Sequence, residues 1–101
     1  MKKVLVAIKD NKVGFLNCSC FDSLEAAQRD FLSLFKPGTS KCADFPEDYD
    51  LYSVGSFDSS SGFISSDYET SDGLAFTPVC IFRGMNAFEY WKNPTEVDKN
   101  A

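Results

Sequence analysis

A β-hairpin is predicted by the stretch Phe45-Pro46-Glu47-Asp48-Tyr49-Asp50-Leu51-Tyr52-Ser53-Val54-Gly55-Ser56-Phe57-Asp58-Ser59-Ser60-Ser61-Gly62-Phe63. Its apolar and aromatic residues favour a strand through Leu51, Tyr52, Val54 and Phe57. Serine and glycine follow, so we expect a turn closed by Gly62 and a return strand that opens at Phe63. The rest of the chain has to supply partners for this hairpin.

Several side chains in this stretch fit turn or helix-start chemistry. Pro46 suits the first turn of a short helical segment, and Glu47 and Asp48 favour its amino end. Asp58 can accept hydrogen bonds from amides ahead of it, and Gly62 can adopt a positive φ. We interpret the carboxylates as turn and cap groups, because the ligand spacing of a calcium loop is missing. The structural turn motif comprises Pro46, Glu47, Asp48, Tyr49, Gly55, Asp58 and Gly62.

The amino-terminal residues predict another hairpin and then a helix. Residues 4–8 form an apolar strand, Asp10-Asn11-Lys12 a turn, and residues 13–21 a return strand. Asp22 or Ser23 can cap the helix, with Glu25 placed as in a capping box after Asp22. Pro37-Gly38 ends the helix. Its apolar stripe is expected to pack on the sheet and comprises Leu24, Ala27, Phe31, Leu34 and Phe35.

The remaining segments carry weaker signals. Residues 39–44 are expected to form a loop, and the Ser-, Asp- and Gly-rich residues 59–73 a mobile loop beyond the short return strand. Residues 74–76 and 79–82 can add an edge strand, because Pro78 confines a strand to an edge or starts one. In the tail, residues 86–91 can present aromatic side chains on a short helix, and disorder is expected after Pro94.

These predictions combine into a single α+β domain over residues 1–82, followed by a C-terminal tail over residues 83–101. We expect a small, mostly antiparallel sheet with the chain order β-β-α-β-β, an extra edge strand and one helix packed on a face. A length of 101 residues fits one core. An exposed edge and ten phenylalanines favour a homodimer.

Composition argues against enzymatic and membrane functions. Without histidine or a recognisable metal cluster, we expect no catalytic residues, no metal site, no cofactor and no enzymatic activity. The apolar run of residues 4–8 is too short for a signal sequence or a membrane span, so we expect an intracellular protein. The cysteines lack the spacing of a structural zinc site and are expected to be free thiols; they are Cys18, Cys20, Cys42 and Cys80.

Charge is distributed unevenly along the chain. The net charge of −5 argues against generic nucleic-acid binding, because phosphate contacts supply most non-specific affinity. Residues 1–41, however, carry seven basic and four acidic side chains, a net +3. Residues 42–101 carry three basic and eleven acidic side chains, a net −8. The amino-terminal half is therefore the candidate nucleic-acid-binding part.

A pattern in the central hairpin resembles that of a known family. It consists of Pro46-Glu47-Asp48-Tyr49, Leu51-Tyr52, Val54-Gly55, Phe57-Asp58 and Ser61-Gly62. The family is the small nonstructural protein of gokushoviruses, the single-stranded DNA phages of the Microviridae. Looser similarity covers residues 3–82 and includes Asp10-Asn11-Lys12-Val13, Phe15, Glu25-Ala26-Ala27, Phe31 and Pro78-Val79.

The chain also departs from the family pattern. Phe45 stands where the family often has histidine, and Cys18-Ser19-Cys20 replaces a proline-containing segment. The residues after Phe82 look like an addition. The resemblance implies a non-enzymatic protein of the host cytoplasm that binds DNA at the switch from duplex replication to single-strand synthesis and packaging. It supplies no established binding residues.

Two functional hypotheses follow. In the first, single-stranded DNA binds the amino-terminal half, with stacking on Phe15, Tyr52 or Phe57 and phosphate contacts from Lys2, Lys3, Lys9, Lys12, Arg29 and Lys41. In the second, the chain is an acidic interaction module that binds a viral replication or procapsid protein, or a host factor, without binding DNA. Its acidic residues would be Asp48, Asp50, Asp58, Asp67, Glu69 and Asp72.

Overall fold

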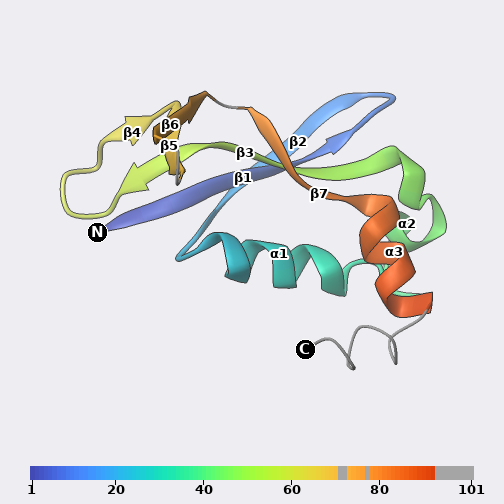
Figure 1. Ribbon diagram of the computed structural model, residues 1–101. Helices are drawn as coiled ribbons and strands as arrows, with labels where there is room; N and C mark the ends of the chain where they lie inside the picture. The colour runs from blue at the N-terminus through green and yellow to red at the C-terminus, as the bar shows by residue number, and fades with distance from the viewer. Residues whose placement is uncertain (71–72, 77, 93–101) are drawn as a thin grey trace.

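The computed structural model describes residues 1–70, 73–76 and 78–92 and confirms a small α+β fold (Figure 1). The strands are β1 (Lys2–Asp10), β2 (Gly14–Phe21), β3 (Tyr49–Asp58), β4 (Ile64–Ser65), β5 (Asp67–Thr70), β6 (Gly73–Phe76) and β7 (Val79–Arg83). The helices are α1 (Leu24–Ser33), α2 (Lys41–Asp44), the short 3-10 helix η1 (Pro46–Asp48) and α3 (Gly84–Lys92).

The main sheet is antiparallel and centred on β1 and β3. Its order is β2-β1-β3, and the far side of β3 is shared by β4 near one end and β7 near the other. As expected from Pro78, β7 is an edge strand. The predicted return strand is also present, although β4 has two residues only.

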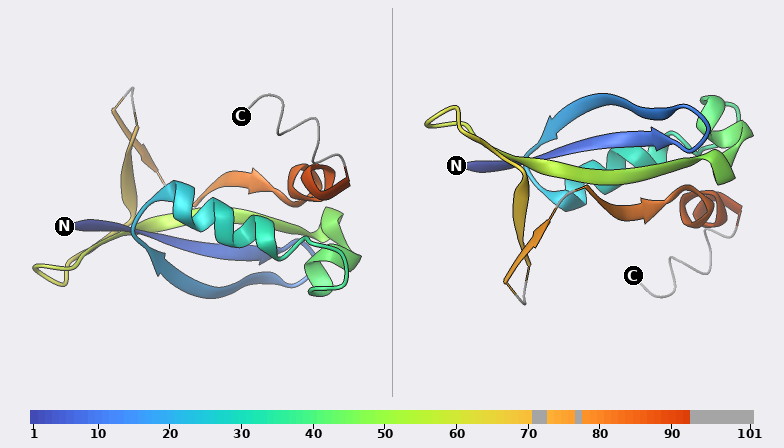
Figure 2. Two further views of the ribbon diagram at one scale, coloured as in Figure 1. Left: turned by 90° about the horizontal axis from the view of Figure 1, so that it is seen from below. Right: turned by 90° about the horizontal axis from the view of Figure 1, so that it is seen from above.

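The main sheet has a helix on one face. Figure 2 shows α1 in front of the strands in the view from below and behind them in the view from above. In the view from above, none of the other described helices lies over β1, β2 and β3. A sheet with a single covering layer has to present its other face to solvent or to a partner.

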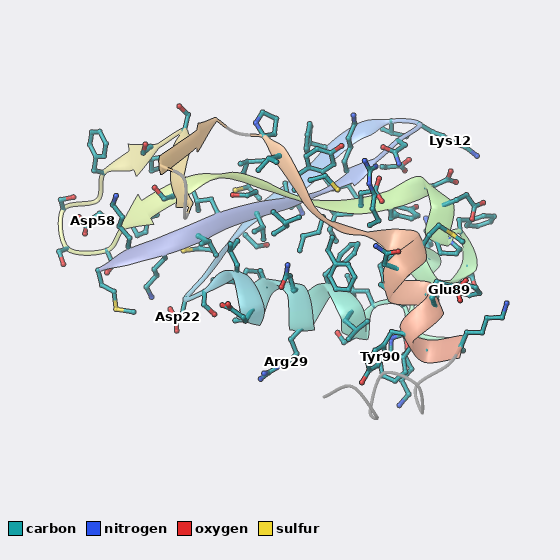
Figure 3. All side chains as sticks on the ribbon, viewed as in Figure 1. Lys12, Asp22, Arg29, Asp58, Glu89 and Tyr90 are labelled. Atoms are coloured by element: carbon teal, nitrogen blue, oxygen red, sulfur yellow. The ribbon has the colours of Figure 1, made fainter. Side chains whose placement is uncertain are left out.

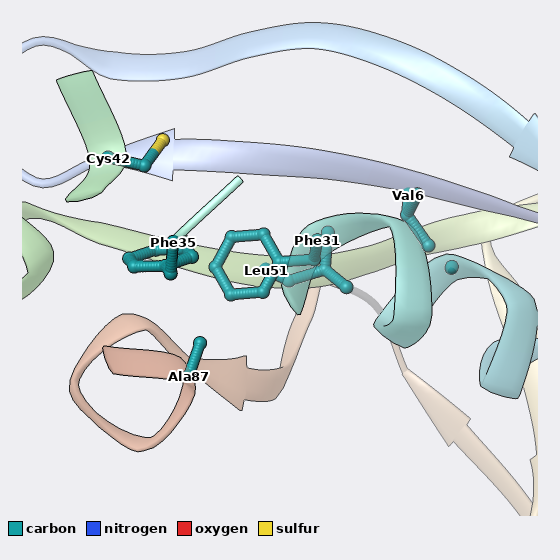
Figure 4. Packing of buried hydrophobic residues seen from close by; sticks show 7 residues of the cluster. Val6, Phe31, Phe35, Cys42, Leu51 and Ala87 are labelled. Carbon is teal, nitrogen blue, oxygen red and sulfur yellow. The ribbon is translucent and has the colours of Figure 1, made fainter. Parts of the chain in front are cut away.

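The core lies between α1 and the sheet, as the apolar stripe predicts. Phe31 and Phe35 are fully buried in it, with their ring centroids 4.8 Å apart in an edge-to-face arrangement. Figure 4 shows these rings between the strands and α3. The buried cluster comprises Val6, Ala27, Phe31, Phe35, Cys42, Leu51 and Ala87. Burying a phenylalanine side chain contributes on the order of 2–3 kcal/mol, so these rings dominate the core.

The helix α1 begins one residue later than a capping box at Asp22 requires. Ser23 is the N-cap, and its hydroxyl accepts a hydrogen bond from the Ala26 backbone N–H at 3.1 Å. Asp22 instead forms an ion pair with Lys3. The predicted box between Asp22 and Glu25 is therefore wrong, because the serine hydroxyl is the acceptor nearest to the free amides.

Residues 41–44 and 67–70, expected to lie in loops, form regular structure. Residues 41–44 form α2, because the Ser40 hydroxyl caps it by accepting from the Cys42 backbone N–H at 3.2 Å. Residues 67–70 and 73–76 pair as β5 and β6 in a separate two-stranded sheet. Residues 74–76 therefore do not extend the edge formed by β7. The serine- and glycine-rich composition of this segment did not predict the pairing, because local sequence specifies the register of such strands only weakly.

The helix α3 lies in the segment expected to be a tail and packs on the core. Ala87 is fully buried, and the Trp91 indole N–H donates to the Leu32 carbonyl at 2.7 Å. Gly84 permits this approach, since a Cβ there would clash with the backbone carbonyls of Tyr49 and Pro46. The expected disordered end after Pro94 lies outside the described residues.

Asp50 connects three parts of the molecule. It is 5% exposed, and its carboxylate accepts from the backbone N–H of Gly84 at 2.9 Å. The Asn11 amide donates to it at 3.1 Å and the Arg83 guanidinium at 3.2 Å. A buried carboxylate is tolerated when donors satisfy it. Asp50 in this way joins β3 to the β1–β2 turn and to the start of α3.

We expect Asp50→Ala to lower the free energy of unfolding by about 2–3 kcal/mol, because it leaves the buried Gly84 N–H without an acceptor. Asp50→Asn keeps an oxygen acceptor and should cost less. Urea unfolding followed by circular dichroism measures both. A loss below about 0.5 kcal/mol for the alanine variant, the size of an ordinary surface substitution, would contradict this role.

Asp58 makes the stability of the folded protein depend on pH. The Ser60 backbone N–H donates to its carboxylate at 2.9 Å, and the Met1 amino group lies 3.3 Å away. These contacts, the Ser60 N–H first, lower the pKa of Asp58 below its usual 3.8. Because the folded-state pKa is depressed, the charged carboxylate stabilises the fold above the unfolded-state pKa, and this stabilisation is lost as the pH falls through the folded-state pKa.

Asp58→Asn should therefore lower Tm at pH 7, and the difference from wild type should shrink as the pH falls below 3.8. Differential scanning calorimetry across pH measures this trend. Glu47→Gln, a change at an exposed carboxylate of η1, is the control and should show a smaller effect at pH 7. A Tm difference for Asp58→Asn that does not vary with pH would refute the assignment.

Candidate nucleic-acid interface

The face of the main sheet opposite α1, here called the open face, carries a defined set of side chains. On β1, Val4, Val6 and Ile8 pack into the core. Successive side chains of a strand point to opposite faces, so Leu5, Ala7 and Lys9 point to the open face. Strand register extends the set across the sheet, and the open face comprises Lys3, Leu5, Ala7, Lys9, Phe15, Cys18, Cys20, Asp50, Tyr52, Gly55, Phe57, Cys80 and Arg83. The Asp50 carboxylate is buried and accepts hydrogen bonds at the start of α3.

A lysine and two aromatic rings meet at the centre of this face. The ring centroids of Phe15 on β2 and Tyr52 on β3 are 5.2 Å apart and nearly perpendicular, at 85°. The Lys9 ammonium, from the intervening strand β1, lies 5.6 Å from the Phe15 centroid and 5.7 Å from the Tyr52 centroid. These are cation–π distances. We call these three residues the Lys9 cluster.

The Lys9 cluster is accessible and positively charged. Phe15 is 46% exposed, and Tyr52 and Lys9 are half-buried. Lys9 makes no ion pair with any carboxylate in the described part of the chain. Ala7, which lies beside Tyr52 and Cys18 in register, is only 4% exposed and is thus covered by its neighbours. An exposed π-face beside an unneutralised cation suits stacking of a base next to its phosphate.

The other basic residues named by the sequence lie elsewhere. Figure 3 shows Arg29 pointing away from the sheet on the outer side of α1, and Lys12 at the far end of the β1–β2 turn. Lys12 forms an ion pair with Asp48, and Lys3 forms one with Asp22. Lys2 starts β1 opposite Asp58, and Lys41 begins α2. Of the six predicted phosphate contacts, therefore, Lys9 lies against two predicted stacking residues, Phe15 and Tyr52. Lys3 is opposite the third, Phe57, in register, but it is paired with Asp22.

Internal donors occupy the three aspartates of the central hairpin. Asp50 is buried among three donors, Asp48 pairs with Lys12, and Asp58 accepts from Ser60 and Met1. The expectation that Asp50 contributes to an acidic surface is wrong, because its carboxylate faces the start of α3. The side chains of Asp67, Glu69 and Asp72 lie outside the described ones.

The turn motif organises the strand that carries Tyr52. Pro46 is buried at the start of η1, and the Asp48 carbonyl accepts from the Asn11 N–H at 2.8 Å. Gly55 has a φ of +154°, and a Cβ there would meet the Ser65 carbonyl oxygen of β4. Only glycine fits this bulge position. Gly62 has a φ of +80° and closes the β3–β4 turn.

Among the residues that the structure describes, no three His, Cys, Asp or Glu side chains come together in a way that could hold a metal ion. The four cysteines are free, with Cys18 and Cys20 exposed on β2. Cys42 is buried, and this burial raises the pKa of its thiol above the usual 9.0. None of the described helices is long and apolar enough to cross a membrane.

Comparison with known proteins gives a match at the level of a family. A family model described as Phage ORF5 protein matches residues 3–72. This span contains the whole Lys9 cluster and the turn motif, whereas β7 and α3 lie beyond it. No curated protein and no solved structure matches the chain.

Thiol reactivity tests which residues face outward. We expect iodoacetamide to alkylate Cys18 and Cys20 well before Cys42 in the folded protein, since both are exposed and Cys42 has low access and a raised pKa. Peptide mass spectrometry over time orders the sites, and alkylation in urea, where all four thiols should react alike, is the control. Protection of Cys18 and Cys20 to the level of Cys42 would show that the open face is covered.

Proposed function

Because this chain belongs to the phage ORF5 protein family, we propose that it is a non-enzymatic phage protein that binds single-stranded DNA on the open face of its sheet. The Lys9 cluster carries this proposal. The similarity of the central hairpin to the nonstructural protein of gokushoviruses refines it. On that basis the chain is a Microviridae protein of the host cytoplasm that acts between duplex replication and packaging.

Single-stranded DNA suits the Lys9 cluster better than a duplex does. The rings of Phe15 and Tyr52 lie on a sheet surface, where a base can reach them only when it is unstacked from its neighbours. Their mutual edge-to-face packing holds both rings in place, so little conformational entropy is lost on binding. Stacking also tolerates any base, which fits binding without sequence preference.

Electrostatics predicts shallow salt dependence. Lys9 is unpaired among the described residues, whereas Lys3 already pairs with Asp22. One to three neutralised phosphates give a slope of log K against log salt of about −0.7 to −2 for a single strand. The six basic residues named by sequence alone would give about −4. The net charge of −5 also disfavours an extended phosphate track.

The test is fluorescence anisotropy of labelled single-stranded and duplex oligonucleotides across a salt series. Phe15→Leu and Tyr52→Leu should each weaken single-strand binding about tenfold, because one stacking contact is worth about 1–3 kcal/mol. Leucine keeps an apolar side chain over Ala7, so these variants should stay folded. A loss of affinity then reports the missing aromatic ring. Lys9→Gln should lower the salt slope by about 0.7.

Arg29→Gln and Lys41→Gln are matched controls, because each removes a positive charge away from the open face. Both should leave affinity within about twofold of wild type, as expected for charges outside the site. If Lys9→Gln, Arg29→Gln and Lys41→Gln all lowered the affinity for single-stranded DNA equally, the DNA would instead contact the whole basic amino-terminal half. No single-strand binding at low salt would refute the proposal and favour the interaction-module hypothesis, in which a viral or host protein is the partner.

A further inference from the structure

The strand β2 is an edge of the main sheet. It pairs with β1 on one side, and no described strand pairs with its other side. Six of its eight residues are exposed. The opposite edge of the sheet differs, because β4 and β7 share it. The backbone N–H and C=O groups along the outer side of β2 can therefore accept another strand.

Apart from the bulge between its Phe15 and Cys18 pairs, β2 lacks the features that protect an edge. Gly-Phe-Leu-Asn-Cys-Ser-Cys-Phe contains no charged residue and no proline, in a chain that is 25% charged. Apolar side chains gather at one end of it, where Val13 is 81% exposed and Phe15 and Leu16 are each 46% exposed. Natural proteins place lysine, proline or a covering segment on such edges to prevent pairing. The absence of lysine and proline from β2, and of a covering strand among the residues that the structure describes, indicates that the edge is used.

We propose that two copies of this chain pair antiparallel through β2 and form one continuous sheet. A second copy is the occupant that this edge fits best. A neutral strand meets its own copy without like-charge repulsion, and the exposed apolar residues at its end gain a partner surface. A charged partner strand would instead find no complementary charge on β2.

The symmetry of such a dimer fixes where the two open faces lie. Two antiparallel neighbouring strands related by a twofold axis require that axis to stand perpendicular to the sheet. Residues directly opposite each other then point to the same side. Both Lys9 clusters therefore face one side, and both α1 helices the other. The longer DNA-binding surface that results rests on the proposed function, whereas the pairing itself does not.

Charged substitutions at Cys18 test the proposed pairing of two β2 strands. Cys18 is exposed near the middle of β2. If the two strands pair about Cys18, its two copies lie directly opposite each other; if they pair about Asn17, the two copies are diagonal neighbours. Analytical ultracentrifugation without DNA should show a wild-type dimer. Cys18→Lys and Cys18→Asp should each weaken dimerisation about tenfold or more, through like-charge contact. An equimolar mixture of the two variants should recover dimers.

Phe63→Lys is the matched control, since it adds a charge at an exposed apolar residue beyond β3, far from β2 along the sheet. It should leave dimerisation unchanged. Circular dichroism of each variant checks folding. A monomeric wild type at 100 μM or more would overturn the inference, as would dimers that resist both Cys18 variants or dissociate with Phe63→Lys. The absence of DNA makes these outcomes independent of the binding test.

Discussion

The hydrogen bonds to Asp50 set the arrangement on which the candidate interface depends. Asp50 lies directly opposite Lys9 in the register of β1 and β3, so the two could neutralise each other. Its carboxylate instead accepts from Asn11, Arg83 and Gly84, which fixes the β1–β2 turn and the start of α3. Lys9 forms no ion pair with any described carboxylate, and its ammonium lies over the Phe15 and Tyr52 rings. One buried carboxylate thus holds the end of the sheet together and preserves a positive charge on its surface.

Sequence reasoning predicted the elements with strong local signals. The hairpin of residues 4–21, the amphipathic helix and the hairpin from Tyr49 each combine a periodic apolar pattern with turn or cap residues, and all three are present. It missed α2 and the pairing of β5 with β6. Those elements are four residues long each, and a serine cap or a few cross-strand contacts decide them.

The candidate site was predictable in its residue types but not in its geometry. Phe15, Tyr52 and Lys9 were each named from sequence, together with five other basic residues. What joins them is a bulge, because the register passes from Ala7–Cys18 to Lys9–Phe15 and places an extra residue in β2. Without that bulge Phe15 would lie on the side of α1, since a shift of one residue moves a strand's side chains to the opposite face. Sequence alone does not locate such a bulge.

The size of the chain explains why a surface of this kind exists. About 100 residues can build one sheet and one covering layer, so one face stays open, and such a face is ordinarily polar. Here it carries aromatic rings and thiols, which cost stability in water unless something covers them. The rings shield Ala7, but aliphatic side chains would do so equally well. Shielding therefore accounts for the apolar volume on this face. It does not account for two aromatic rings held against a lysine that has no ion-pair partner among the described residues. The proposal that the open face takes a ligand with both bases and phosphates rests on that combination.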